Sequence, residues 1–125
     1  LVGSIALWTI GLVVVSFLFF NFSTGSDYDL DTFAQCVSDS GADMYSSFKC
    51  GHCANQKAMF GDSFEYINEI ECHPDGENSQ TSLCLEKGIT GTPTWVIEID
   101  GKEINRQAGV MELEELAEFT GCTLE

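Results

Sequence analysis

The residues most able to do chemistry in this sequence are Cys50 and Cys53, which bound a Cys-Gly-His-Cys run. The run 42–48 before them predicts a short strand, and 54–60 after them predicts a helix that ends at a glycine. Such a junction places the first sulfur at a helix N-terminus, where free N–H groups and the helix dipole favour an anion. We therefore expect the Cys50 thiol to have a lowered pKa and to act as a nucleophile.

Cys53 follows one helical turn later and lies on the same face as Cys50, close enough to form a readily opened disulfide. This arrangement favours thiol–disulfide exchange through a mixed disulfide. His52 is interpreted as a donor that stabilises the thiolate, and the alternative is a merely exposed histidine. A stabilised thiolate stabilises the reduced pair, so the pair should act as an oxidant.

Two other uses of the same cysteines have to be weighed. One is an inert structural disulfide between Cys50 and Cys53. The other is a zinc site, whose ligands would come from Cys50, Cys53, Cys72, His73 and Cys84. The second half of that set lacks a closely spaced pair of ligands, so we expect no metal.

Composition narrows the class of protein. The chain has 125 residues, six cysteines and a formal net charge of −15. This length leaves room for one small domain after an apolar N-terminal run, and six cysteines favour an oxidising compartment. The negative charge argues against nucleic acid and against an anionic membrane surface as partners.

Residues 1–22 carry no charge and are long enough to cross a bilayer as a helix. Phenylalanines occupy the place where a cleaved signal peptide has small residues, so a membrane anchor is favoured. The following segment, 23–31, has acidic residues but no Lys or Arg, which predicts a position outside the cytoplasm. We expect a transmembrane helix at 1–22, a linker at 23–28 and one domain at 29–125.

Hydrophobic spacing and turn residues predict an alternation of helices and strands in the domain. Asp100-Gly101 predicts a two-residue hairpin. The expected order is helix 29–38, strand 42–48, helix 54–60, a strand within 63–72, helix 80–87, a strand starting at Pro93, strand 102–106 and helix 110–119. This order predicts an α/β fold with a central mixed sheet and helices on both faces.

The sequence resembles thioredoxin-fold proteins. The Cys-Gly-His-Cys run is followed about forty residues later by Thr92-Pro93, before the Asp-Gly hairpin. Within this fold, the sequence shows a closer similarity to the thioredoxin-like domain that follows the last membrane helix in bacterial and plant homologues of vitamin K epoxide reductase. The pieces that match are 32–36, 41–45, 55–57, 59–61, 71–72, 88–89, 91–95, 116–117 and 120–122.

This resemblance implies a protein thiol–disulfide oxidoreductase with a thioredoxin-like fold and a redox-active disulfide. It also implies a cis peptide bond before Pro93, facing the cysteines. Thr92 would offer backbone hydrogen bonds to an extended substrate segment. Trp95 and Phe48 are interpreted as core residues rather than substrate contacts.

Two residues depart from the pattern of the family. Lys49 replaces the usual tryptophan before the first active cysteine, and its charge near Cys50 would favour the thiolate. Met44 stands where thioredoxin and the disulfide isomerases have a buried acid that helps to move protons. Without this acid, we expect no fast proton transfer at Cys53 by a neighbouring carboxyl group.

The other four cysteines are interpreted as structural disulfides. Cys72 and Cys84 flank one loop and helix, whereas Cys36 and Cys122 lie on the two terminal helices. We therefore expect the pairs Cys72–Cys84 and Cys36–Cys122, one of three pairings that four cysteines allow.

The expected function is a membrane-anchored oxidoreductase that forms or isomerises disulfides in exported proteins that contain cysteines, with no cofactor in the domain. Its domain would face the periplasm, the cell exterior or the thylakoid lumen. The resemblance implies that electrons pass to a vitamin K epoxide reductase-like membrane domain and then to a quinone. The alternatives are a stand-alone anchored reductase or isomerase, and a non-catalytic disulfide-stapled or zinc-binding domain.

Overall fold

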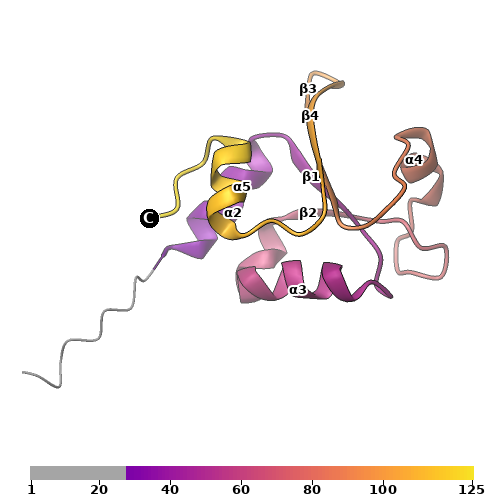
Figure 1. Cartoon of the computed structure of the whole chain (residues 1–125), viewed down its shortest axis with the longest axis horizontal. Coiled ribbons are helices and arrows are strands. Elements are labelled where there is room, and N and C mark those ends of the chain that lie inside the picture. The colour runs from indigo at the N-terminus through magenta and orange to yellow at the C-terminus, as the bar shows by residue number, and fades with distance from the viewer. Residues whose placement is uncertain (1–27) are drawn as a thin grey trace, which may run out of the picture.

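A four-stranded mixed sheet forms the centre of the molecule, with the strand order β2-β1-β3-β4 (Figure 1). The computed structural model describes residues 28–125. Its strands are β1 (Ala42–Ser46), β2 (Asn68–Glu71), β3 (Thr94–Ile99) and β4 (Lys102–Ala108). β1 runs parallel to β2 and antiparallel to β3, and β3 and β4 form the predicted antiparallel hairpin. The prediction of a mixed sheet is confirmed.

Helices cover both faces of this sheet. They are α2 (Leu30–Asp39), α3 (Gly51–Phe60), α4 (Thr81–Glu86) and α5 (Leu113–Thr120), and a 3-10 helix, η1 (Gly61–Tyr66), follows α3. Figure 1 shows α2, α3 and α5 on one side of the sheet and α4 on the other. Apart from η1, the elements follow the predicted order.

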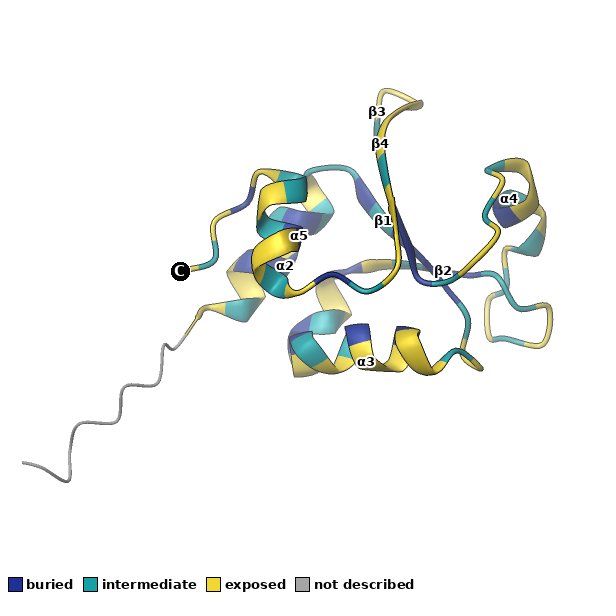
Figure 2. Ribbon diagram, in the orientation of Figure 1, coloured by how far each residue is buried: buried dark blue, intermediate teal, exposed yellow. Residues whose placement is uncertain are grey.

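The core is divided between the two faces because alternate residues of a strand point to opposite sides. Met44 of β1 lies in the larger cluster, under the three helices, and its neighbour Tyr45 lies in the smaller one, under α4. Figure 2 shows that β1 is largely buried, while β4, at the edge of the sheet, is largely exposed. The larger cluster includes Phe33, Val37, Met44, Phe60, Trp95, Ile97 and Leu116.

Around the redox motif, three predicted elements differ from the structure in their bounds. The first strand ends at Ser46 and not at 48, because the chain turns before the redox motif. The helix after it starts at Gly51, because the preceding cysteine caps the helix with its own sulfur. The predicted strand within 63–72 covers only β2, and residues 61–66 form η1, so their apolar residues do not alternate.

The predicted transmembrane helix at 1–22 lies outside the described residues, as does nearly all of the predicted linker at 23–28. Within 28–125, no helix has the length and apolar character needed to cross a membrane. The anchor therefore stays a prediction.

Candidate active site

Cys50 lies at the point where the chain leaves β1 and enters α3. It is the N-cap residue of α3, and its Sγ accepts a hydrogen bond from the backbone N–H of Cys53 at 3.3 Å. The Cys50 thiol also contacts the carbonyl oxygen of Thr92 at 3.3 Å. The fold thus brings the loop before β3 against a sulfur that is 42 residues away in the sequence.

The surroundings of the Cys50 sulfur favour its thiolate. Burial by itself raises the pKa of the thiol. Hydrogen bonds from the Thr92 side chain, from the Cys53 thiol and from the backbone N–H groups of Cys53 and His52 outweigh it. The net result is a lowered pKa, which makes Cys50 the more nucleophilic of the two thiols.

Cys53 has the opposite character, because it is 1% exposed and its pKa is raised. Burial is the largest cause, and the hydrogen bond with the Cys50 thiol acts in the same direction. The Ser47 backbone, the Thr92 side chain and the Ser46 side chain oppose the shift without reversing it. Both Cys50 and Cys53 are free thiols in this structure. The site therefore combines a thiol that ionises readily, Cys50, with a buried thiol that does not, Cys53.

The loop that faces Cys50 is held in place by hydrogen bonds within it and from the end of β4. The Thr92–Pro93 peptide bond is cis, and Pro93 is fully buried. The Pro93 carbonyl oxygen accepts a hydrogen bond from Gly109 at 2.8 Å, and the Thr94 hydroxyl donates to the Gly91 carbonyl at 2.7 Å. These contacts fix the Thr92 carbonyl beside the Cys50 sulfur.

His52 is placed differently from its predicted role. It lies exposed in the first turn of α3, and its imidazole makes no hydrogen bond among the described residues. Only its backbone N–H acts on the Cys50 sulfur. In this structure the first turn of the helix therefore supplies the donor that was expected from the imidazole.

Phe48 was predicted to lie in the core, and this prediction is wrong. Its side chain is 55% exposed, because the strand ends two residues earlier and the turn carries the ring outward. The ring packs edge-on against His73 with centroids 5.2 Å apart, and Lys49 Nζ lies 5.6 Å from its centroid. Trp95, in contrast, is fully buried, as predicted.

Glu71 is a residue of this region for which the sequence predicted no role in the site. Its carboxylate is largely buried and accepts the backbone N–H groups of Phe48 at 3.3 Å and His73 at 3.0 Å. It therefore ties the turn before Cys50 to the loop after β2. No sequence signal marks this role, since it depends on two loops that meet only in the folded chain.

The remaining cysteines form two disulfides in the structure. Cys36 of α2 is joined to Cys122, which follows α5, with Cα atoms 5.9 Å apart. Cys72, which follows β2, is joined to Cys84 of α4, with Cα atoms 5.7 Å apart. The second bond uses two cysteines that the alternative zinc site would need, and within residues 28–125 no group of three or more His, Cys, Asp or Glu side chains is placed to hold a metal ion.

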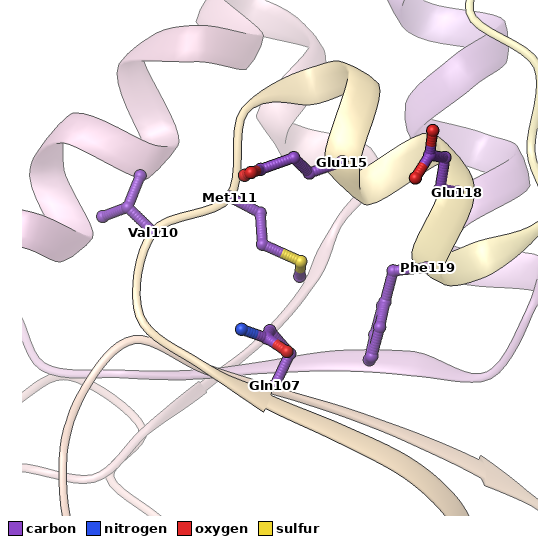
Figure 3. Close-up of a pocket in the computed structure, with 6 residues that line it drawn as sticks. All are labelled: Gln107, Val110, Met111, Glu115, Glu118 and Phe119. Atoms are coloured by element: carbon purple, nitrogen blue, oxygen red, sulfur yellow. The ribbon is translucent and has the colours of Figure 1, made fainter.

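A pocket of about 430 Å³ opens between β4 and α5 (Figure 3). Figure 3 shows the Met111 and Phe119 side chains at this pocket, with two glutamates of α5 around it. The residues that line it are Gln107, Val110, Met111, Glu115, Glu118 and Phe119. None of the predicted site residues is among them.

Comparison with known proteins finds similarity both in sequence and in fold. No family profile matches the chain. The thiol-disulfide oxidoreductase LTO1 of Arabidopsis thaliana is 39% identical over 107 residues, which cover 82% of this chain and 27% of that protein. The chain therefore spans about a quarter of the length of this curated relative.

Solved thioredoxins share the fold. A mutant thioredoxin from Halobacterium salinarum superposes with a TM-score of 0.53 and 17% identity over 74% of this chain and 82% of its own. Thioredoxin from Plasmodium falciparum gives 0.52 and 13% identity over 70% of this chain and 89% of its own. The predicted thioredoxin-like fold is confirmed.

Proposed function

We propose that this domain forms or isomerises disulfides in proteins, with Cys50 as the nucleophile and Cys53 as the resolving thiol. One observation carries the proposal: the Cys50 sulfur caps α3 against the Thr92–Pro93 loop, with its pKa lowered. A sulfur so placed is accessible to a second sulfur and is a good leaving group from a mixed disulfide.

Disulfide formation would run in two exchanges. A substrate thiolate attacks Sγ of Cys50 in the Cys50–Cys53 disulfide, the bond between these cysteines breaks, and Cys53 leaves as a thiolate that takes up a proton. A second substrate thiolate then attacks the substrate sulfur of the mixed disulfide and displaces Cys50 as a thiolate. The substrate loses two electrons, and the cysteine pair gains them.

The wider setting of this activity is also part of the proposal. The apolar run 1–22, the acidic segment after it and the six cysteines support an anchored domain on the exoplasmic side of a membrane. Its substrates would be exported proteins with cysteines. The resemblance to domains fused to vitamin K epoxide reductase homologues supports a relay from Cys53 and Cys50 to such a membrane domain and its quinone.

The activity is tested with the full chain in its oxidised form and a reduced, unfolded protein with two cysteines as substrate. We expect one substrate disulfide per chain, and Cys50→Ser should lower the rate by a factor of about 10³ or more. Reduced Cys53→Ser, mixed with the same substrate in its disulfide form, should instead accumulate a mixed disulfide between Cys50 and one substrate cysteine while the other substrate cysteine leaves as a thiolate, visible as a mass increase under acid quench. Exchange that survives in Cys50→Ser would refute the assignment.

The direction of electron flow is tested by equilibration in graded glutathione buffers, followed by alkylation and mass mapping. A potential well above that of thioredoxin, about −270 mV, supports an oxidant, and a value near it supports the alternative of a reductase. Six free thiols together with bound zinc would refute the oxidoreductase proposal.

The relay is tested by adding the reduced full chain to vesicles that contain a vitamin K epoxide reductase homologue and a quinone. Oxidation of Cys50 and Cys53 that requires both additions supports the relay. Equal oxidation without the homologue favours the stand-alone enzyme.

A further inference from the structure

Ser46 is a buried serine directly before the turn into the active site. It is the last residue of β1 and is fully buried. Its backbone carbonyl accepts the Cys72 N–H at 2.8 Å, but its hydroxyl has no hydrogen-bond partner with good geometry among the described residues. Buried hydroxyl groups without a partner are uncommon in proteins, so this one calls for an explanation.

The Ser46 hydroxyl lies on the face of β1 that α3 covers, and Cys53 is buried in the first turn of that helix. Burial raises the pKa of Cys53, and the Ser46 hydroxyl is among the polar groups that lower it. Among the described groups that shift the pKa of Cys53, only Cys50 is itself titratable. A hydroxyl that makes no well-aligned hydrogen bond to the neutral thiol can donate one to the thiolate, which is a stronger acceptor.

The position of Ser46 on β1 is a second observation that links its hydroxyl to the cysteine pair. Met44 is fully buried in the core and brings no carboxylate to the site. Met44 and Ser46 are two residues apart on β1, so both side chains point to the face that α3 covers. Ser46 is nearer than Met44 to the turn that leads to the cysteines. Its hydroxyl therefore places a hydrogen-bond donor on that face of the strand.

We propose that Ser46 is a catalytic hydrogen-bond donor to the Cys53 thiolate, a role that rests on the proposed thiol–disulfide exchange. When a substrate thiolate attacks Cys50, the electron pair of the breaking bond passes to the Cys53 sulfur. The Ser46 hydroxyl stabilises that charge until a proton arrives from water. In the reverse direction it stabilises the Cys53 thiolate that attacks the mixed disulfide, and the departing substrate thiolate takes up the proton that Cys53 lost.

Ser46→Ala in the full chain tests this role. We expect reduction of the oxidised pair by dithiothreitol to slow about fivefold, because a less stabilised thiolate is a poorer leaving group. The ¹³Cβ titration of Cys53 in the reduced chain should move to higher pH. The glutathione equilibrium at pH 7 should change less than twofold, because Cys53 is protonated in both reduced chains.

Two further variants distinguish the effect of the Ser46 hydroxyl from an effect of packing. Ser46→Thr keeps the hydroxyl and should retain most of the rate. Ser63→Ala removes another buried hydroxyl, which is bonded to Asp31 Oδ1 at 2.5 Å, and should change neither the rate nor the Cys53 titration. Equal slowing in Ser46→Thr and Ser46→Ala would show a packing effect and overturn the proposal.

The outcomes also distinguish this inference from the function on which it rests. A wild-type chain that exchanges normally, together with an unchanged rate and Cys53 titration in Ser46→Ala, would overturn the inference alone. A wild-type chain without any exchange would refute the proposed function, while the titration of Cys53 would still report whether Ser46 stabilises its thiolate.

Discussion

At the scale of single residues, the site is defined by the contrast between Cys50 and Cys53. The two side chains are chemically identical and three positions apart, yet the pKa of one is lowered and that of the other is raised. The difference arises from the surroundings: at Cys50 the effect of burial is outweighed by hydrogen bonds from Thr92, Cys53 and His52, whereas burial dominates at Cys53 in the first turn of α3.

This contrast predicts the pH dependence of alkylation. Iodoacetamide reacts with thiolates, so the alkylation rate at Cys50 should reach half of its plateau at a lower pH than that of an ordinary thiol, whose pKa is about 8.5. The rate should fall only as the pH drops through the lowered pKa of Cys50. Mass-resolved alkylation of the reduced chain measures it, and a midpoint for Cys50 at or above that of Cys53 would contradict the prediction.

The same shift affects the stability of the reduced chain. A thiol with a depressed pKa contributes stability above its unfolded pKa and loses this contribution as the pH falls through the folded pKa. The difference in unfolding free energy between wild type and Cys50→Ala should therefore increase with pH across this range. Urea titrations at several pH values measure this difference, and a difference that shrinks as the pH rises would show that the sign is wrong.

At the scale of elements, one buried glutamine joins α3 to the rest of the fold. Gln56 is fully buried, and its Oε1 accepts Trp95 Nε1 at 3.2 Å and the Met111 N–H at 2.8 Å. Its Nε2 donates to the Met111 carbonyl at 2.9 Å. The helix that carries the cysteines is thus connected to β3 and to the segment before α5.

Removal of this side chain should destabilise the fold strongly. Gln56→Ala leaves a buried indole N–H and two backbone groups without partners, and we expect a loss of about 2–4 kcal/mol of unfolding free energy. Asn55→Ala, an exposed position on the same helix, is the matched control and should change it by less than about 0.5 kcal/mol. Equal losses in the two variants, measured by urea unfolding, would refute this role.

At the scale of the whole molecule, two disulfides join elements that are far apart in the chain. Cys36–Cys122 spans 86 residues and Cys72–Cys84 spans 12. The first connects the two ends of the described domain, and the second attaches α4 to the end of β2. A crosslink over the longer span removes more conformational freedom from the unfolded chain.

The two bonds should therefore contribute unequally. We expect Cys36→Ala with Cys122→Ala to lower the unfolding free energy by about 4 kcal/mol, and the other double variant by about 3 kcal/mol. Non-reducing peptide mapping identifies the pairs in the wild type, and a peptide that joins Cys36 to Cys72 would contradict the pairing. Neither double variant should abolish exchange at Cys50.

The order of elements and the redox motif could be predicted because their signals are local. Hydrophobic spacing, the Asp-Gly turn and two cysteines one helical turn apart act over a few residues, which propensity and periodicity describe well. Phe48, Ser46 and Glu71 could not be assigned in this way. Their roles depend on where β1 ends and which loops meet there, and both are set by packing between distant segments. The sequence by itself determined the chemistry of Cys50 and Cys53, whereas the tertiary structure decided their surroundings, because desolvation and hydrogen bonds act through space.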